Sequence, residues 1–183
     1  MAGAVLDLEE FVMRLFIAIN FGAETRSRLI ALREQLRSRS RAGNFSFDEN
    51  LHLTLAFIGE CSPKDTGKIK SELETVALTP FEVRVERLGT FSHGTLWWAG
   101  LSEDEPLMAL QREIARRLTL LGFPSNDRKY SPHITLGREV VTDARPWPII
   151  PFGETAGAID LMKSERLKGR LTYTSIFKKS AGA

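Results

Sequence analysis

The sequence carries the stretch Glu49-Asn50-Leu51-His52-Leu53-Thr54-Leu55, and roughly half a chain later its second part recurs as His133-Ile134-Thr135-Leu136. In each copy the histidine and the threonine stand two positions apart, so in a β-strand both side chains leave the same face. The apolar residues between them leave the opposite face, where a core can bury them. The repeat therefore predicts two similar lobes, each of which presents one imidazole and one hydroxyl to a shared groove.

Apolar periodicity on either side of the two copies predicts the other strands. In the strand of the first copy, the odd-numbered residues from Leu51 to Phe57 are expected to face the core. The segment from Gly89 to Leu101 is expected to form a hairpin that turns at Ser92-His93-Gly94. The prolines at 146, 148 and 151 indicate a crossing segment. Strands are predicted at 14–20, 44–47, 51–59, 81–88, 133–141, 158–164 and 170–177.

Three segments have the features of helices. Leucines recur every three or four positions from Leu29 to Leu36 and give the segment 23–39 one apolar face. Ser62 before Pro63 is a good helix start, with serine as the N-cap and proline in the first turn. A third apolar stripe covers 105–121, and Gly122 is a natural C-terminal cap. Together, the strands and helices predict an α+β fold with mostly antiparallel sheets whose outer faces are covered by helices.

Composition narrows the class of protein. A length of 183 residues suits one domain. The formal charge is only +2, but the basic residues are unevenly distributed: arginines are concentrated in 26–41, and further lysines and arginines in 163–179. Such runs are most often a solvated surface, although they also suit a polyanionic partner such as RNA. Cys61 is the single cysteine and excludes an internal disulfide. It sits in a turn-like sequence, which argues against a catalytic thiol.

The ends of the chain and its hydropathy bear on location. Residues 1–12 are acidic where a secretory signal would be basic, and we interpret them as an extension before a fold that starts at Met13. The predicted domain covers 13–179. No stretch approaches the length of a membrane span. We therefore expect a cytoplasmic monomer that does not bind membranes.

The two-histidine pattern suits one kind of chemistry in particular. An in-line displacement at phosphorus needs a base for the entering oxygen and an acid for the leaving oxygen, and imidazole fills either role near neutral pH. The hydroxyls of Thr54 and Thr135 can donate to the phosphate oxygens that carry the transition-state charge. This scheme needs neither a metal ion nor another cofactor. The pattern therefore predicts a phosphodiesterase with His52 and His133 in one active site.

Other interpretations of the same residues are less favoured. One His-x-Thr strand alone would usually hold a half-exposed histidine of no special role, but here two of the three histidines occupy matching copies. A metal site needs a third ligand. Glu60, Asp127 and Glu139 are available, but none stands at a recognised spacing. A serine hydrolase is disfavoured because the sequence contains no nucleophile elbow.

The paired motifs resemble those of the two-histidine (2H) phosphoesterases. The stretches 49–55 and 131–138 are most similar to the RNA 2′,3′-cyclic phosphodiesterases, also called 2′-5′ RNA ligases, and the likeness spans about 13–177. It implies a bilobal fold with pseudo-twofold symmetry around a central groove. It also implies hydrolysis of RNA terminal 2′,3′-cyclic phosphates to 2′-phosphates, with His52 as proton donor to the leaving oxygen and His133 as proton acceptor from water. Joining of such an end to a 5′-hydroxyl is the implied minor activity.

Several more residues are candidates for substrate binding. Arg138 matches a family arginine that contacts the phosphate, but its odd offset from His133 needs a strand end or a bulge near Gly137 to turn it inward. Phe45 or Phe47 is a candidate for stacking on a base, with core packing as the alternative. Tyr130 is a candidate for the groove rim. His93 is expected to be a turn residue rather than a third catalyst.

The expected partner is RNA with a 2′,3′-cyclic phosphate end, tRNA fragments included. Two rival functions stay open at this stage. One is an RNA-binding module that has lost catalysis, although both histidines and both threonines are intact. The other is a 2H enzyme that acts on small cyclic nucleotides or on ADP-ribose cyclic phosphates.

Overall fold

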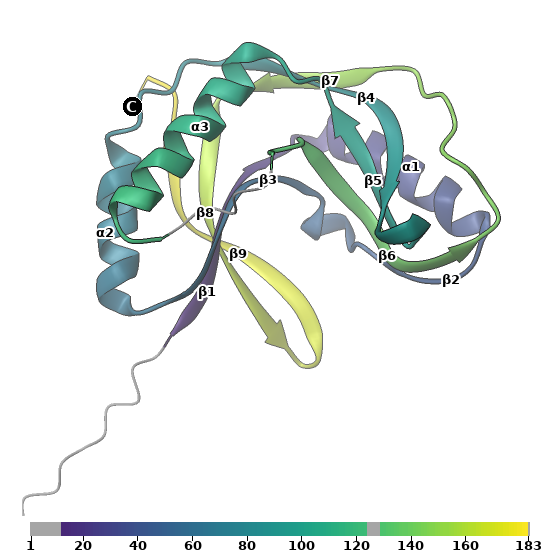
Figure 1. Ribbon diagram of the computed structural model, residues 1–183, viewed down its shortest axis with the longest axis horizontal. Coiled ribbons are helices and arrows are strands. Elements are labelled where there is room, and N and C mark those ends of the chain that lie inside the picture. Colours follow the sequence, from purple (N-terminus) through teal and green to yellow (C-terminus); the bar gives the residue numbers. More distant parts are fainter. Residues whose placement is uncertain (1–11, 124–128, 183) are drawn as a thin grey trace, which may run out of the picture.

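The computed structural model describes residues 12–123 and 129–182, so the extension predicted at 1–12 lies outside the described residues except for Val12. Over this range the chain forms two antiparallel sheets that stand side by side (Figure 1). This confirms the predicted α+β class. No helix in the described ranges is long and apolar enough to cross a membrane.

The first sheet contains four strands in the order β3-β1-β8-β9. Its middle strand β1 is buried from Leu15 to Ile19, because the continuous apolar run faces the core on one side and the floor of a groove on the other. β8 and β9 continue beyond the body of the sheet as a projecting hairpin (Figure 1). The strands are β1 (Met13–Asn20), β3 (His52–Cys61), β8 (Ala158–Leu167) and β9 (Arg170–Ser180).

The second sheet contains five strands in the order β2-β6-β5-β4-β7. β4 and β5 form the predicted hairpin, which turns through Ser92 and His93, both with positive φ. His93 is therefore a turn residue, as expected. The strands are β2 (Ser40–Phe45), β4 (Phe81–Phe91), β5 (Leu96–Leu101), β6 (His133–Thr142) and β7 (Phe152–Ala156).

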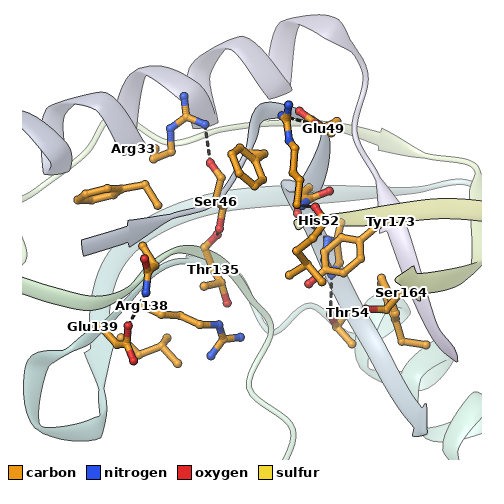
Figure 2. A pocket seen from close by; sticks show the side chains of 18 of the residues that line it. Arg33, Ser46, Glu49, His52, Thr54, Thr135, Arg138, Glu139, Ser164 and Tyr173 are labelled. Atoms are coloured by element: carbon orange, nitrogen blue, oxygen red, sulfur yellow. Dashed lines mark hydrogen bonds and ion pairs between the residues drawn. The ribbon is translucent and has the colours of Figure 1, made fainter. Parts of the chain in front are cut away.

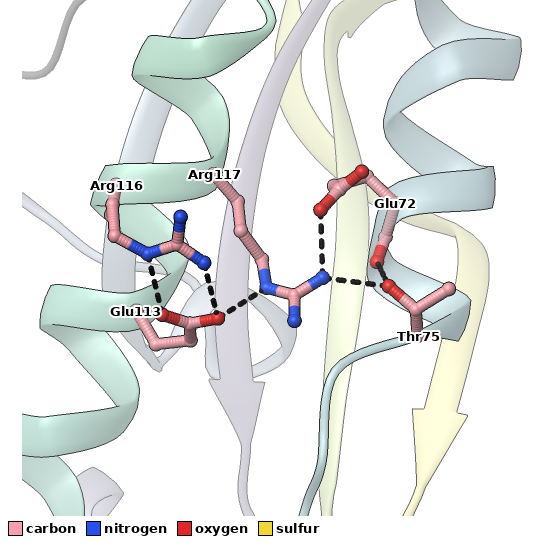
Figure 3. A network of polar contacts seen from close by, with 5 residues as sticks. All are labelled: Glu72, Thr75, Glu113, Arg116 and Arg117. Atoms are coloured by element: carbon pink, nitrogen blue, oxygen red, sulfur yellow. Dashed lines mark hydrogen bonds and ion pairs between the residues drawn. The ribbon is translucent and has the colours of Figure 1, made fainter.

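The three predicted helices all form. α1 (Ala23–Ser38) packs on the second sheet through its leucine face, of which Leu29 and Leu36 are fully buried. α2 (Pro63–Glu74) starts as predicted, with the Ser62 hydroxyl accepting from the backbone N–H of Asp65. α3 (Glu105–Leu120) lies beside α2 (Figure 1). Arg117 joins the two helices by contacting Glu72 on α2, Thr75 at the C-terminal cap of α2, and Glu113 on its own helix (Figure 3).

A matching irregularity interrupts the two motif strands. In β3, Thr54 pairs with Ala18 and Ala56 pairs with Ile17, so Leu55 is skipped by the ladder. In β6, Thr135 pairs with Trp98 and Gly137 pairs with Trp97, so Leu136 is skipped in the same way. A bulge of this kind adds one residue and exchanges the two faces of the strand that follows. Both lobes therefore carry the same bulge at the same distance from their histidine.

Three expectations about strands were wrong. Phe57 was expected in the core, but it is 66% exposed, because the bulge at Leu55 turns it to the opposite face. The proline-rich crossing contains β7, which starts directly after Pro151. At Gly153 of this strand a Cβ atom would lie 1.8 Å from the Val83 carbonyl oxygen, so glycine lets β7 approach β4 closely. The strand predicted at 44–47 is shifted upstream, to 40–45.

Candidate active site

The two lobes enclose a groove of about 1490 Å³ that His52, Thr54, His133 and Thr135 all line. Figure 2 shows His52 and Thr54 on one side of it and Thr135 with Arg138 on the other. The fold thus brings both motifs to one shared groove. The remaining lining residues include a set of arginines from several elements, namely Arg14, Arg33, Arg37, Arg138, Arg166 and Arg170.

Each imidazole is held by a carbonyl of its own chain. Nδ1 of His52 lies 2.7 Å from the carbonyl oxygen of Asn50, and Nδ1 of His133 lies 2.7 Å from that of Ser131. A carbonyl oxygen only accepts, so both Nδ1 atoms carry the proton. Each Nε2 is then free to accept a proton when the ring is neutral and to donate one when it is charged. This gives each histidine the form that acid and base catalysis require.

An aromatic ring meets each imidazole edge to face. The ring of Tyr173 lies 5.1 Å from that of His52 at 86°, and the ring of Phe91 lies 5.2 Å from that of His133 at 89°. The Phe16 ring contacts both rings of the first pair: its centroid lies 4.9 Å from that of His52 and 5.0 Å from that of Tyr173. These contacts limit rotation of the two imidazole rings.

Burial makes His52 a weak base in the empty groove. Burial is the main reason why the pKa of His52 is lowered from 6.5 to about 4; the hydrogen bond to the Asn50 carbonyl opposes the shift, and the charge of His133 contributes to it. His52 is therefore neutral at pH 7 in the free protein. Its Nε2 lies 2.9 Å from the Thr54 hydroxyl, which donates to it because Nδ1 already holds the ring proton.

The second threonine is fixed through its backbone. The Ser46 hydroxyl donates to the Thr135 carbonyl oxygen at 2.7 Å, and the Ser46 amide donates to that of Leu136 at 2.9 Å. Arg33, only 7% exposed, donates to the Ser46 carbonyl at 2.6 Å (Figure 2). It also forms an ion pair with Asp48. These contacts fix the backbone of Thr135, which lines the groove.

Arg138 lines the groove because a bulge precedes it, as its odd offset from His133 required. The bulge at Leu136 turns it to the face of His133 and Thr135, and it lines the groove with its guanidinium exposed. Gly137 is needed beside it, because a Cβ there would come within 2.9 Å of Val140 and 3.1 Å of Phe45. Burial raises the pKa of Tyr173 on the opposite sheet, and the charges of Arg138 and Arg14 oppose that shift. The positive charge of Arg138 therefore acts across the groove.

The other predicted binding residues have different placements. Phe45 lines the groove but is half-buried against the core. Phe47 lines it with 40% of its surface exposed, and the Arg170 guanidinium lies 4.0 Å from its ring. Tyr130 is half-buried and lies outside the groove lining; its hydroxyl donates to the Thr54 carbonyl oxygen at 2.9 Å. The expectation that Tyr130 reaches the groove rim is thus corrected: it supports the first motif from behind.

Sequence reasoning missed Tyr173, Phe91, Ser46 and Arg33. Tyr173 pairs with Ser164 in the C-terminal hairpin, whose turn at Gly169 was predicted. The sequence contains no signal that this hairpin brings Tyr173 into contact with His52. Phe91 precedes a predicted turn and gave no sign that it meets His133. Within the described residues, no three histidine, cysteine, aspartate or glutamate side chains cluster as metal ligands. Asp127, one of the available metal ligands named in the sequence, lies outside the described residues.

Comparison with known proteins identifies the family of this chain. A family model described as the 2′-5′ RNA ligase superfamily matches residues 26–150. The RNA 2′,3′-cyclic phosphodiesterase of Archaeoglobus fulgidus is 30% identical over 151 residues, which is 78% of this chain and 85% of the relative. Its namesake in Escherichia coli is 29% identical over 167 residues, 89% of this chain and 93% of the relative. The crystal structure of E. coli LigT complexed with 3′-AMP shares the fold, with a TM-score of 0.81 at 24% identity over 94% of this chain and 99% of that one.

Proposed function

Because the chain belongs to the 2′-5′ RNA ligase superfamily, we propose that it is an RNA 2′,3′-cyclic phosphodiesterase that opens the terminal cyclic phosphate to a 2′-phosphate. The observation that carries the proposal is the matched pair of imidazoles. Both hold their Nδ1 proton on a carbonyl 2.7 Å away and both face one groove. Relatives named for this activity support the choice of reaction.

In the proposed reaction, Nε2 of His133 takes a proton from water, and the water oxygen attacks phosphorus. The bond from phosphorus to the 3′ oxygen breaks, and protonated His52 gives its proton to that oxygen. The product then carries a 2′-phosphate and a 3′-hydroxyl. Thr54, Thr135 and Arg138 hold the non-bridging oxygens, whose charge grows in the transition state. Every proton transfer uses a protein side chain, so the scheme requires no metal ion.

The low pKa of His52 bears on which histidine is the acid. With a pKa of about 4, His52 in the free protein lacks at neutral pH the proton that it must donate. A bound phosphodiester anion brings a negative charge beside Nε2, and such a charge favours the protonated ring. We therefore propose that His52 becomes an acid upon substrate binding, which also makes Thr54 free to turn its hydroxyl proton to the phosphate.

The size of the groove favours an RNA end over a lone cyclic nucleotide. Pockets for small molecules usually measure about 300–1,000 Å³, and this groove of about 1490 Å³ is larger. Its arginines come from α1, β1, β6 and the β8–β9 hairpin, so they can contact more than one phosphate. We further propose that residues 13–179 act as one bilobal domain in a cytoplasmic monomer, with tRNA fragments among its substrates. Ligation to a 5′-hydroxyl would be a minor reaction of the same site.

The test is turnover of a short RNA that ends in a 2′,3′-cyclic phosphate, beside the matching cyclic mononucleotide. We expect a 2′-phosphate product and a higher kcat/KM for the oligonucleotide. A higher kcat/KM for the mononucleotide would instead support an enzyme of small cyclic nucleotides. Binding of the oligonucleotide without turnover of either substrate would support an RNA-binding module.

A further inference from the structure

The carbonyl groups that hold the two histidines of the site come from corresponding positions. Asn50 lies two residues before His52, and Ser131 lies two residues before His133. Nδ1 of each histidine is bonded to that carbonyl at 2.7 Å. The orientation of each imidazole therefore depends on how firmly the segment in front of its strand is held.

The two segments are anchored in different ways. In the second lobe the anchor is backbone, since the Pro132 carbonyl accepts a hydrogen bond of 3.0 Å from the Leu101 amide. In the first lobe the anchor is a side chain: Nδ2 of Asn50 donates to the Leu171 carbonyl on β9 at 2.9 Å. The carbonyl that holds His52 is thus kept in place by a strand from the far end of the chain.

Asn50 occupies its position at a cost in stability. The residue is only 7% exposed, and its Oδ1 atom is buried without a hydrogen-bond donor among the described residues. The amide cannot be turned over to pair this oxygen, because Nδ2 faces a carbonyl, which only accepts. An unpaired buried acceptor opposes folding, and a leucine of similar size would leave none. The bond from Nδ2 to β9 is the contribution that an apolar residue could not make.

His52 depends on its carbonyl because a second place for the ring proton is available. Nε2 of His52 lies 2.9 Å from the Thr54 hydroxyl, which can accept as well as donate. A ring that lost the Asn50 carbonyl could therefore keep its one proton on Nε2, directed at Thr54. The hydrogen bond to Asn50 also raises the pKa of His52 against the effect of burial, so its loss would disfavour the protonated ring as well.

We propose that Asn50 is a positioning residue for the acid: its bond to β9 keeps its carbonyl on Nδ1 of His52, so that Nε2 carries the transferable proton. This inference rests on the proposed function, because it takes His52 to be the acid. The same bond fixes β9 beside the site, since Tyr173, two residues beyond Leu171, packs edge to face on His52 (Figure 2). One side chain thereby secures both supports of the acid, the carbonyl and the aromatic ring.

The first experiment reads the histidine tautomers in the free protein. Asn50→Leu keeps the approximate size of the side chain and removes the donor. NMR of the ring nitrogens, at a pH where both rings are neutral, should show His52 change from the Nδ1-protonated form to a mixture of tautomers, while His133 stays Nδ1-protonated. Ser131→Ala is the matched comparison, because the Ser131 side chain makes no hydrogen bond within the described ranges, and it should leave both rings unchanged.

Two NMR results would overturn the proposal. One is a His52 ring that remains fully Nδ1-protonated in Asn50→Leu. The other is a Ser131→Ala protein whose His133 ring changes as much as His52 does in Asn50→Leu, since the side-chain anchor would then be irrelevant. Melting temperatures check that the variants fold, and Asn50→Ala provides the same measurement in a second variant.

The second experiment separates loss of the acid from general damage. It compares an RNA 2′,3′-cyclic phosphate with an analogue in which sulfur replaces the bridging 3′ oxygen. A thiolate leaves without a proton, because thiols are far stronger acids than alcohols, so the analogue needs no acid. Asn50→Leu should lower kcat/KM for the oxygen substrate by roughly 10- to 100-fold, part of the about 10²–10⁴-fold that a positioned acid contributes. It should leave kcat/KM for the sulfur analogue within about threefold of wild type.

The outcomes distinguish this inference from the proposed function. Equal losses on the two substrates would show that Asn50 has a structural role alone, and so would contradict the inference. If wild type turns over neither substrate, the proposed function fails. The ring NMR then still decides whether Asn50 holds the tautomer of His52, because that measurement requires no turnover.

Discussion

The hydroxyl of Tyr130 donates a hydrogen bond of 2.9 Å to the carbonyl oxygen of Thr54. The segment that leads into the second motif is thereby tied to the strand of the first. Burial raises the pKa of Tyr130, so the hydroxyl keeps its proton throughout the physiological pH range. The bond couples the two halves of the site at the threonine that neighbours His52.

Tyr130→Phe removes this coupling and leaves the Thr54 carbonyl without its partner. We expect a loss of about 1–2 kcal/mol in the free energy of unfolding, measured by urea denaturation. We also expect a several-fold fall in kcat, because Thr54 is then less firmly placed. Tyr173→Phe is the control for stability, since the Tyr173 hydroxyl makes no hydrogen bond within the described ranges. Equal stability of wild type and Tyr130→Phe would show that the bond is weak in solution.

Phosphate binding should raise the pKa of His52. In the free protein burial holds it at about 4, so the ring gains its proton only well below neutral pH. An anion between Thr54 and Thr135 stabilises the charged ring and shifts that titration upward, toward neutrality. NMR titration of the histidine ring protons, with and without saturating inorganic phosphate, measures the change. An unchanged His52 titration would mean that the anion binds elsewhere.

Arg138 should matter through its geometry as well as its charge. Arg138→Ala is expected to lower kcat/KM by roughly 10²-fold, because the transition state loses a charged donor to phosphate. Arg138→Lys should recover only part of this, since lysine lacks the planar pair of donors. Arg41→Ala, on the neighbouring strand and paired with Asp143, is the control and should keep normal kinetics. Full activity of Arg138→Lys would reduce the role of Arg138 to that of a point charge.

The link between α2 and α3 should make stability depend on pH. The side chains of Arg116 and Arg117 lower the pKa of Glu113 to about 2, below its ordinary value of 4.5 (Figure 3). A carboxyl whose pKa is depressed in the folded state stabilises the fold above its unfolded pKa, and this contribution is lost as pH falls from about 4.5 toward 2. Glu113→Gln should therefore flatten the fall in melting temperature over this range. A mutant curve parallel to that of wild type would show that the ion pairs contribute little.

Arg117→Met tests the same link at neutral pH. It leaves Glu72 and Glu113 without the cation that both contact, so we expect a loss of roughly 1–2 kcal/mol in stability. Arg112→Met removes an exposed pair with Glu105 and should cost less. Denaturant midpoints measure both. A larger loss for Arg112→Met would contradict the assignment.

The sequence predicted the fold well where periodicity and end signals agreed. The Ser62-Pro63 start of α2, the leucine face of α1 and the hairpin turn at His93 all formed as expected. β7 was missed because three prolines and Gly153 favour a loop, while the strand itself contains few apolar residues. An edge strand needs fewer apolar residues than a central one, so its sequence signal is weak. β2 is a polar edge strand, and its position was off by several residues for the same reason.

The bulges mark the limit of prediction for the site. Strict alternation placed His52 and Thr54 correctly, yet it sent Phe57 to the core and left Arg138 dependent on an irregularity. The bulges in β3 and β6 depend on how these strands pair with β1 and β5, which are distant from them in the sequence. The small residues Ala56 and Gly137 after the skipped leucines were the available signal. The long-range contacts of Tyr173 and Phe91 likewise depend on tertiary structure alone.

The most direct test of the paired-histidine mechanism is single-turnover hydrolysis of a cyclic-phosphate RNA in EDTA by wild type, His52→Ala, His133→Ala and the double mutant. Paired acid and base roles predict that each single mutant loses about 10²-fold or more in rate and that the double mutant loses much less than the product of the two. Folding of the variants is checked by their melting temperatures. Near-normal rates for either single mutant, or a wild-type rate that EDTA abolishes and a divalent ion restores, would contradict the mechanism.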